Sequence, residues 1–172
     1  SEAAANYERK KQELMVQSVP VFKNIRKEQG SKIENVIVPF TDGRRGIQAL
    51  ANMNKTLETN GAEMVNSLER TVTLGFIDDA WKEHLRSMDD LKQSVQTATY
   101  EQKDPLVIYK MEAFELFKKM DGEVNRDIVQ FLCHAGIPLN SGDELKEGRR
   151  EKTDMSRMSA NKEDVDGPPA EN

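Results

Sequence analysis

Cys133 and His134 are adjacent in the sequence and are of the residue types that bind metal ions or act in nucleophilic catalysis. Cys133 is the only cysteine, so no disulfide can form within the chain and a CxxC zinc site is excluded. Neighbours on a helix point roughly 100° apart, which makes joint ligation of one ion awkward. The second histidine, His84, lies in a distant part of the sequence. We therefore favour a structural role for the pair over metal binding or nucleophilic catalysis.

Adjacent carboxylates occur at 78–79 and again at 89–90. Such pairs can act as general acid and base. A lysine, a glutamate and an arginine lie between them, however, so a solvated, ion-paired helix face explains them better. Contact of the second pair with another domain stays open. Neither GxxxxGK[ST] nor GxGxxG occurs, so an ATP site, if the function needs one, lies outside this chain.

The composition favours elongated helices and a solvated tail over a compact enzyme. Charged residues make up 32%, apolar residues 37% and aromatic residues 6% of the chain. The net charge of −5 argues against nucleic acid as the main partner. No apolar run approaches the ~20 residues that cross a bilayer, and no secretory signal opens the sequence. Because the chain starts at Ser1 in helical sequence, we expect it to be a fragment of a longer protein.

Helix formers dominate residues 3–28, which predict a helix that Pro20 kinks or splits and that Gly30 ends. Residues 33–48 are β-branched and aromatic around an Asp-Gly turn at 42–43, so they predict a small β-hairpin. Pro39 should restrict the first strand to the edge of a sheet.

The pattern is helical again from about Asn52 to Thr97, with Gly61 and Gly75 as tolerated weak points. Apolar positions in its second half follow a heptad seam. The seam residues are Ile77, Trp81, His84, Met88, Leu91, Val95 and Ala98. We expect His84 to be a hydrogen-bonded seam histidine, although a pH switch stays open.

A further helix is predicted from Pro105, with Asp104 as its N-cap, to a stop at Gly136 and Pro138. Its apolar stripe has the period of the seam, so the two helices should pack as an antiparallel hairpin. The stripe comprises Ala113, Phe117, Met120, Val124, Phe131 and Ala135, flanked by Phe114, Ile128 and Leu132.

The predicted fold class is mainly all-α, an elongated antiparallel helical hairpin with an N-terminal helix, a small β-hairpin insertion and a disordered C-terminal tail. Beyond Asn140 the chain has no aromatic residue and few large apolar ones, too few to offset its ordering entropy. We divide the chain into an N-terminal segment, an insertion, the helical hairpin and a tail. Their bounds are 1–30, 31–50, 51–138 and 139–172.

The stretch TATYEQKDP, residues 97–105, connects the two long predicted helices. Tyr100 lies within it, and the residues alone leave two interpretations open. The tyrosine either contacts a partner or is a single exposed aromatic of the common kind.

Several uncommon residues recur in order across residues 68–135. They read WKEHL at 81–85, Met88-Asp89 and Leu91, Tyr100-x-Gln102-Lys103-Asp104-Pro105, then Tyr109-Lys110-x-Glu112 and Phe114. This series resembles the helical scaffold and two-helix finger of SecA, the ATPase motor of bacterial preprotein translocation. Residues 7–10 (YERK) resemble the end of the neighbouring helical wing domain. The chain differs from many family members at Ala98-Thr99, where those carry Arg-Gly.

The resemblance implies that the hairpin tip at Thr99, Tyr100 and Gln102 contacts the translocating polypeptide and that the finger reaches the SecY channel. It also implies contacts of the scaffold with the rest of the motor, which would couple or restrain ATP hydrolysis. The matching motif residues are Trp81, His84, Asp89, Lys103, Asp104, Pro105, Tyr109 and Glu112. ATP and Mg²⁺ would bind in motor domains absent here, so this chain alone should be neither an enzyme nor a cofactor or metal binder. The implied location is cytoplasmic, peripheral at the inner membrane.

Two other classes of protein remain open at this point. A free-standing coiled-coil adaptor would dimerise through the 77–98 seam and would form no hairpin within one chain. A small hydrolase using an aspartate, a histidine and Cys133 would show turnover in isolation.

Overall fold

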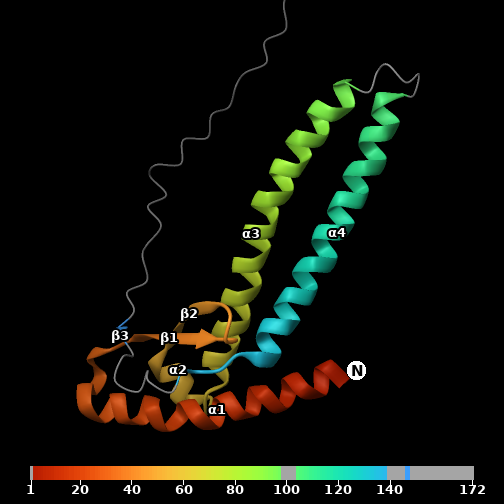
Figure 1. Ribbon diagram of the computed structural model, residues 1–172. Coiled ribbons are helices and arrows are strands. Elements are labelled where there is room, and N and C mark those ends of the chain that lie inside the picture. Colours follow the sequence, from red (N-terminus) through yellow and green to blue (C-terminus); the bar gives the residue numbers. More distant parts are fainter. Residues whose placement is uncertain (1, 98–103, 139–145, 148–172) are drawn as a thin grey trace, which may run out of the picture.

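The computed structural model describes residues 2–97, 104–138 and 146–147. Their elements are, in order, α1 (Glu2–Gln29), the 3₁₀ turn η1 (Gly30–Lys32), β1 (Asn35–Thr41), β2 (Gly46–Asn52), α2 (Met53–Glu58), α3 (Ala62–Thr97), α4 (Pro105–His134) and β3 (Lys146–Glu147). Figure 1 shows a base of α1, α2 and the strands, from which α3 and α4 project side by side. The predicted mainly helical fold with a helical hairpin and a small β-hairpin is confirmed.

Helix α1 lies across the base and is one continuous helix, so it is not split at Pro20. Leu14 and Phe22 are fully buried on either side of the proline along α1, and Ser18 is buried between them. The proline itself is exposed. Burial of this face against the base stabilises the helix enough to offset the one backbone hydrogen bond that proline removes. The helix ends before Gly30, as predicted, and Gly30 has a φ of +65°.

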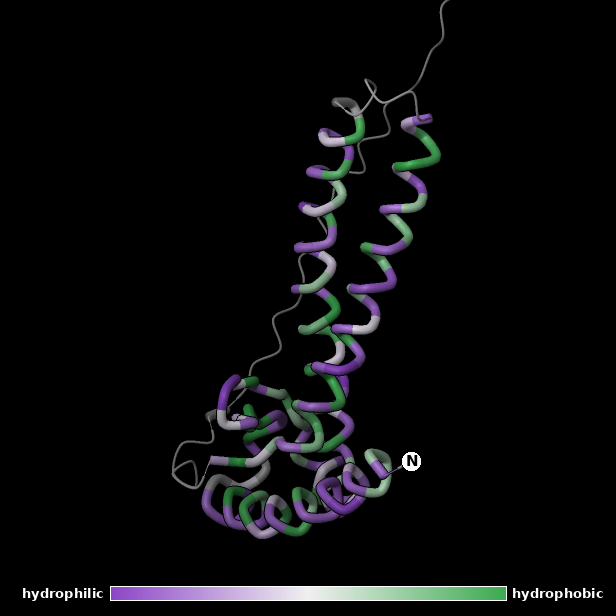
Figure 2. Tube along the Cα trace, turned by 45° about the vertical axis from the view of Figure 1, so that its right-hand side comes forward, coloured by the Kyte–Doolittle hydropathy of each residue, from purple (hydrophilic) through white to green (hydrophobic). Residues whose placement is uncertain are grey.

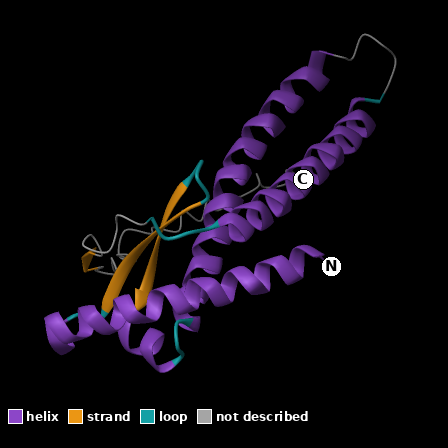
Figure 3. Cartoon of the chain, turned by 60° about the horizontal axis from the view of Figure 1, so that its bottom comes forward, coloured by secondary structure: helices purple, strands orange, loops and turns teal. Residues whose placement is uncertain are grey.

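The β-hairpin forms at the predicted turn. β1 and β2 pair antiparallel from Asn35 opposite Asn52 to Thr41 opposite Gly46. Gly43 has a φ of +87°, a conformation that favours glycine. Figure 3 shows the two strands beside the lower part of α3, against which β2 packs.

The predicted edge position of β1 is wrong, because the strand order is β2-β1-β3. β3 pairs with β1 only at Val36 and Ile37. Pro39 pairs with Gln48 on β2 and lies beyond the end of β3, so its missing amide interrupts no ladder on that side. The rest of the predicted disordered tail, 139–145 and 148–172, lies outside the described residues.

The helical stretch predicted from Asn52 is interrupted at Gly61, which was wrongly expected to be tolerated within it: α2 ends and α3 begins anew at Ala62. Asn60 and Gly61 between them have φ values of +51° and +93°. A Cβ at Gly61 would lie only 3.1 Å from the Cα of Met15 on α1. The chain therefore turns at a glycine that lets α1 approach closely. Gly75, by contrast, lies inside α3 as predicted.

The hydrophobic core lies in the base and draws on six elements. Its fully buried large side chains include Phe22 from α1, Phe40 from β1, Met53 from α2 and Phe131 from α4. The first turns of α3 complete it with Met64, Val65, Leu68 and Val72. One end of the helical hairpin is thus held in a packed core while the rest extends away from it.

The helical hairpin is long. α3 has 36 residues and α4 has 30, which correspond to about 54 Å and 45 Å at ~1.5 Å per residue. α4 begins as predicted, because Pro105 occupies its first turn and the carboxylate of Asp104 accepts a hydrogen bond from the Leu106 amide at 2.9 Å. It ends at His134, just before the predicted stop at Gly136.

Candidate functional site

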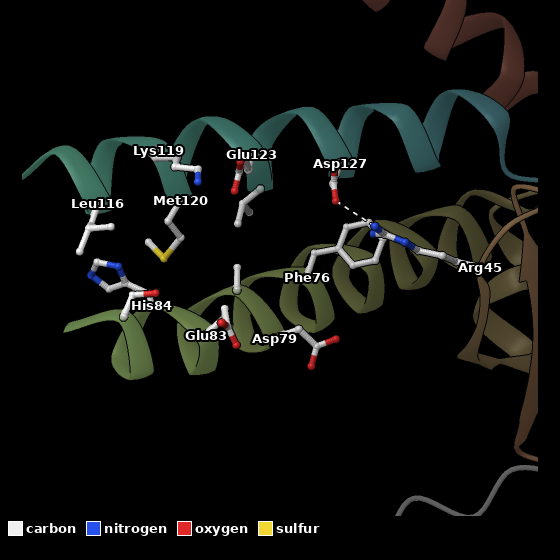
Figure 4. A pocket seen from close by; sticks show the side chains of 13 residues that line it. Arg45, Phe76, Asp79, Glu83, His84, Leu116, Lys119, Met120, Glu123 and Asp127 are labelled. Atoms are coloured by element: carbon white, nitrogen blue, oxygen red, sulfur yellow. Dashed lines mark hydrogen bonds and ion pairs between the residues drawn. The ribbon is translucent and has the colours of Figure 1, made fainter. Parts of the chain in front are cut away.

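A groove runs between α3 and α4, with a volume of about 640 Å³. Figure 4 shows Arg45 and Phe76 at its base end and His84 and Leu116 at the other. Met120 extends into the groove from α4. Charged side chains of both signs line the rest of it, namely Asp79, Glu83, Lys119, Glu123 and Asp127.

Four side chains from three elements meet at the base end of this groove. The Arg45 guanidinium lies 4.9 Å from the centre of the Phe76 ring on α3. Its Nη2 also lies 3.1 Å from Oδ2 of Asp127 on α4. The Phe76 ring in turn packs edge to face against Phe131, with 5.8 Å between ring centres. We call Arg45, Phe76, Asp127 and Phe131 the base cluster.

A second aromatic cluster spans the two helices farther from the base. The His84 ring lies 5.5 Å from Trp81 on its own helix and 6.0 Å from Phe117 on α4, between ring centres. Trp81 and Phe117 are each 46% exposed, so their rings face solvent on one side. The predicted seam histidine thus contacts the facing helix through the Phe117 ring.

The seam prediction is right toward the far end of α3 and wrong toward the base. Leu91 and Val95 are buried, but Ile77 and Trp81 are each 46% exposed. Phe76 and Ala80 line the groove where the heptad pattern predicted those two residues. On α4, Phe131 is buried as predicted whereas Phe117 is not.

Each helix of the hairpin therefore carries apolar side chains that stay exposed to solvent, which we call the outward apolar stripes. Some of them also border the other helix: Phe117 contacts His84, and Met111 and Phe114 line a hollow shared with α3. The exposed apolar residues of α3 are Leu74, Ile77, Trp81 and Leu85, and those of α4 are Leu106, Val107, Met111, Phe114, Phe117 and Val129. Figure 2 shows hydrophobic positions recurring along both helices well above the base. A surface of this kind is typical of a protein–protein interface.

The first carboxylate pair lies on an ion-paired face, as predicted. Lys82 Nζ lies 2.5 Å from Asp78 Oδ2 and 3.9 Å from Asp79 Oδ1. The hydrogen bond that the Lys82 ammonium donates to the Asp78 carboxylate raises the pKa of Lys82 above its ordinary value. Asp89 and Asp90 are exposed, which leaves them accessible to another domain.

Cys133 and His134 lie at the end of α4 and contact different parts of the backbone. His134 is exposed, and its Nδ1 lies 2.8 Å from the backbone oxygen of Gln130. Cys133 is half-buried, with Sγ 4.0 Å from the backbone oxygen of Ala3 on α1. Within the described part of the chain, no group of three potential metal ligands comes together.

Sequence reasoning missed a polar contact that joins α1 to α3. The Tyr7 hydroxyl donates a hydrogen bond to Glu69 Oε1 at 2.6 Å, and Lys11 Nζ lies 3.3 Å from the same oxygen. Burial raises the pKa of the Tyr7 phenol above its ordinary value, and the Glu69 carboxylate adds to the shift. Periodicity could not indicate this contact, because the partners lie 62 residues apart in the sequence.

The remaining motif residues lie along α4 or outside the described part of the chain. Asp104 and Pro105 begin α4, Tyr109 is half-buried and Glu112 is exposed. The predicted tip residues Thr99, Tyr100 and Gln102, and Lys103 beside them, fall outside the described residues. The ends of α3 and α4 that flank this segment lie far from the base.

These features define a class of protein: a helical scaffold whose packed base carries a projecting two-helix hairpin. Residues 2–136 match the family model described as the SecA Wing and Scaffold domain. The chain belongs to the SecA family. Among helices of the described residues, none has the length and apolar character needed to cross a membrane.

Curated relatives resemble nearly the whole chain. The protein translocase subunit SecA of Christiangramia forsetii is 42% identical over 95% of this chain, and that of Cytophaga hutchinsonii is 41% identical over 95%. The match covers 14% and 15% of those two relatives. The SecA of Bacteroides fragilis is 38% identical over 96% of this chain and 16% of its own length. No solved structure matched the chain.

Proposed function

We propose that this chain serves as the wing and scaffold part of an ATP-driven preprotein translocase motor. Its helical hairpin would present residues 98–103 to the translocating polypeptide and to the SecY channel. The observation that carries the proposal is the projection of α3 and α4 from a packed base in a chain of the SecA family. Tyr100 would supply a broad amphipathic contact that demands no particular substrate sequence.

The outward apolar stripes support a second part of the proposal, contact with the remainder of the motor. Trp81 and Phe114 are 46% and 62% exposed, which is costly for a surface without a partner. The relatives are about seven times longer than the matched region, so they contain ample chain to cover it. Through this contact the scaffold would couple to or restrain the ATPase, whose ATP and Mg²⁺ sites lie in that remainder. We expect no turnover from this chain alone, and a cytoplasmic location peripheral to the inner membrane.

Photo-crosslinking tests whether Tyr100 contacts the translocating polypeptide. A photoreactive amino acid replaces Tyr100 in the full-length translocase subunit, which is then engaged with a stalled preprotein. We expect a crosslink from this position to the preprotein, and none from a control at Lys118, which is exposed midway along α4. Labelling from Thr99 and Gln102 without labelling from Tyr100 would contradict the assignment of the contact to the tyrosine.

A free-standing adaptor is the second candidate, and the exposed stripe at Ile77 and Trp81 is the observation that favours it. Such an adaptor would dimerise through α3, and sedimentation equilibrium tests this. We expect the chain to sediment as a monomer, with α3 and α4 paired within one molecule. A stable dimer that Trp81→Ser dissociates would favour the adaptor.

A further inference from the structure

The turn between β1 and β2 reaches the base of the helical hairpin and contacts both of its helices. Arg45 in this turn lies over the Phe76 ring of α3 and forms an ion pair with Asp127 of α4. Asp127 precedes Phe131 by one helical turn, and Phe131 packs against Phe76. The base cluster therefore joins the turn to both α3 and α4, and Figure 4 shows Arg45 between Phe76 and Asp127.

The backbone of this turn is held in a defined conformation. Asp42 Oδ1 accepts hydrogen bonds from the amides of Arg44 and Arg45 at 2.8 Å and 2.6 Å. Thr41 Oγ1 accepts another from the Gly43 amide at 3.0 Å. The amide of Arg45, followed by that of Arg44, lowers the pKa of the Asp42 carboxyl below its ordinary value. These hydrogen bonds therefore fix the backbone from which the Arg45 side chain extends.

The same β-hairpin contacts the chain just beyond α4 and near the start of α3. Thr41 and Gly136 exchange two backbone hydrogen bonds, of 2.9 Å and 2.8 Å. Ser67 on α3 donates a side-chain hydrogen bond to the backbone oxygen of Leu50 on β2 at 2.5 Å. The small β-hairpin therefore contacts both helices where they enter the base.

We propose that Arg45 is a positioning residue. Through Arg45, the β-hairpin sets the angle that the helical hairpin makes with α1. The proposal rests on the proposed function, because direction matters only if the tip must reach a partner. The helical hairpin is long, because α3 has 36 residues. A rotation of one degree at the base therefore moves the far end of α3 by about 1 Å. An exposed ion pair such as Arg45–Asp127 contributes little to the free energy of unfolding. At the base of the hairpin, however, the pair controls the position of the far end of α3.

Pulsed electron paramagnetic resonance on the 172-residue chain tests the proposal, because its core is formed within the chain. Spin labels are attached at Asn24→Cys on α1 and Lys92→Cys near the far end of α3, both exposed, in a Cys133→Ser background. The variants are Arg45→Ala, which removes the ring contact and the ion pair, and Asp127→Asn, which removes only the charge. The matched control is Arg44→Ala, an exposed arginine in the same turn.

We expect Arg45→Ala to shift or broaden the label-to-label distance distribution by several ångströms while circular dichroism retains the helical signal. Asp127→Asn should give a smaller change of the same kind, and Arg44→Ala should match the unaltered chain. If Arg45→Ala loses the helical signal, Asp127→Asn decides, since it keeps the side-chain volume. Distributions that superimpose on the unaltered chain for the folded variants would overturn the positioning role.

This outcome is separable from the proposed function. A missing crosslink at Tyr100 with a changed distance distribution would overturn the polypeptide contact and leave the positioning role of Arg45 standing. An unchanged distribution overturns the positioning role, whatever Tyr100 contacts.

Discussion

The contact between Tyr7 and Glu69 illustrates how one polar pair can attach α1 to the helical hairpin. The hydroxyl and carboxylate are 2.6 Å apart and half-buried, with Lys11 beside the same oxygen. A hydrogen bond to a charged acceptor typically contributes about 1.5–3 kcal/mol, and partial exposure favours the lower value. The pair lies near the start of α1, where few large apolar side chains contribute to the core.

This pair predicts a loss of stability at alkaline pH. The pKa of Tyr7 is raised in the folded state from its ordinary value of 10.0, so the native chain holds the phenol proton more tightly than the unfolded chain. Its contribution is fully present below pH 10 and is lost as the pH rises from there toward the folded pKa. Urea unfolding of Tyr7→Phe should show about 1.5 kcal/mol less stability at pH 7 and a shallower decline above pH 10.

The control for this measurement is Tyr109→Phe on α4. That variant leaves the hydrogen bond between Tyr7 and Glu69 in place, so the alkaline decline that this pair causes should remain. A Tyr7→Phe curve that stays parallel to that of the unaltered chain above pH 10 would contradict the role of this phenol.

At the scale of the elements, two glycines differ in their surroundings. Gly61 lies in the break between α2 and α3, and Gly75 lies inside α3. Gly61 has a φ of +93°, and a Cβ there would lie 3.1 Å from Met15 Cα and 3.2 Å from its backbone oxygen. Gly75 lies inside α3 with nothing within 4 Å of an added Cβ. The same substitution should therefore have opposite effects at the two positions.

We predict that Gly61→Ala lowers the free energy of unfolding by at least about 2 kcal/mol, because both the backbone conformation and the contact with α1 oppose a side chain. Gly75→Ala should raise it by about 0.5–1 kcal/mol, as expected for alanine in an exposed helix interior. Chemical denaturation of the two variants measures both changes. Equal effects at the two sites would show that the α1 contact does not constrain the turn.

Local sequence signals were sufficient for most element boundaries. Asp104 and Pro105 begin α4, Gly30 follows the end of α1, and Asp42-Gly43 forms the β-turn, because each acts through its own backbone geometry. Gly61 was wrongly expected to be tolerated inside a helix. The feature that the sequence did not indicate is the close approach of Met15 from α1. A contact between distant segments leaves no periodic signal.

The candidate site was less predictable for the same reason. A heptad pattern shows that a face is apolar but does not show what covers it. Trp81 and Ile77 carry that signal and yet face outward, while Phe76 and Ala80 line the groove. Arg45 follows a predicted turn, but nothing in its neighbourhood in the sequence indicates that Phe76 and Asp127 lie within its reach.

At the scale of the whole molecule, the outward apolar stripes predict a difference between the chain alone and the full-length subunit. Hydroxyl-radical footprinting should label Trp81 and Phe114 strongly in the chain alone, since they are 46% and 62% exposed. In the full-length subunit their labelling should fall several-fold, because the remainder of the motor would cover them.

Phe22, which is fully buried, is the internal control and should stay weakly labelled in both samples. Equal labelling of Trp81 in the two samples would contradict the proposed contact between this face and the remainder of the motor.

The base cluster also bears on the order in which the chain folds during synthesis. Arg45 and Asp127 are 82 residues apart, and the core joins Leu14 to Phe131 and Ala135. The β-hairpin and the first turns of α3 leave the ribosome long before α4 is complete, so early segments expose apolar surface until the last turns of α4 arrive. A nascent chain of this protein should therefore resist protease at the base only after about residue 136 has emerged.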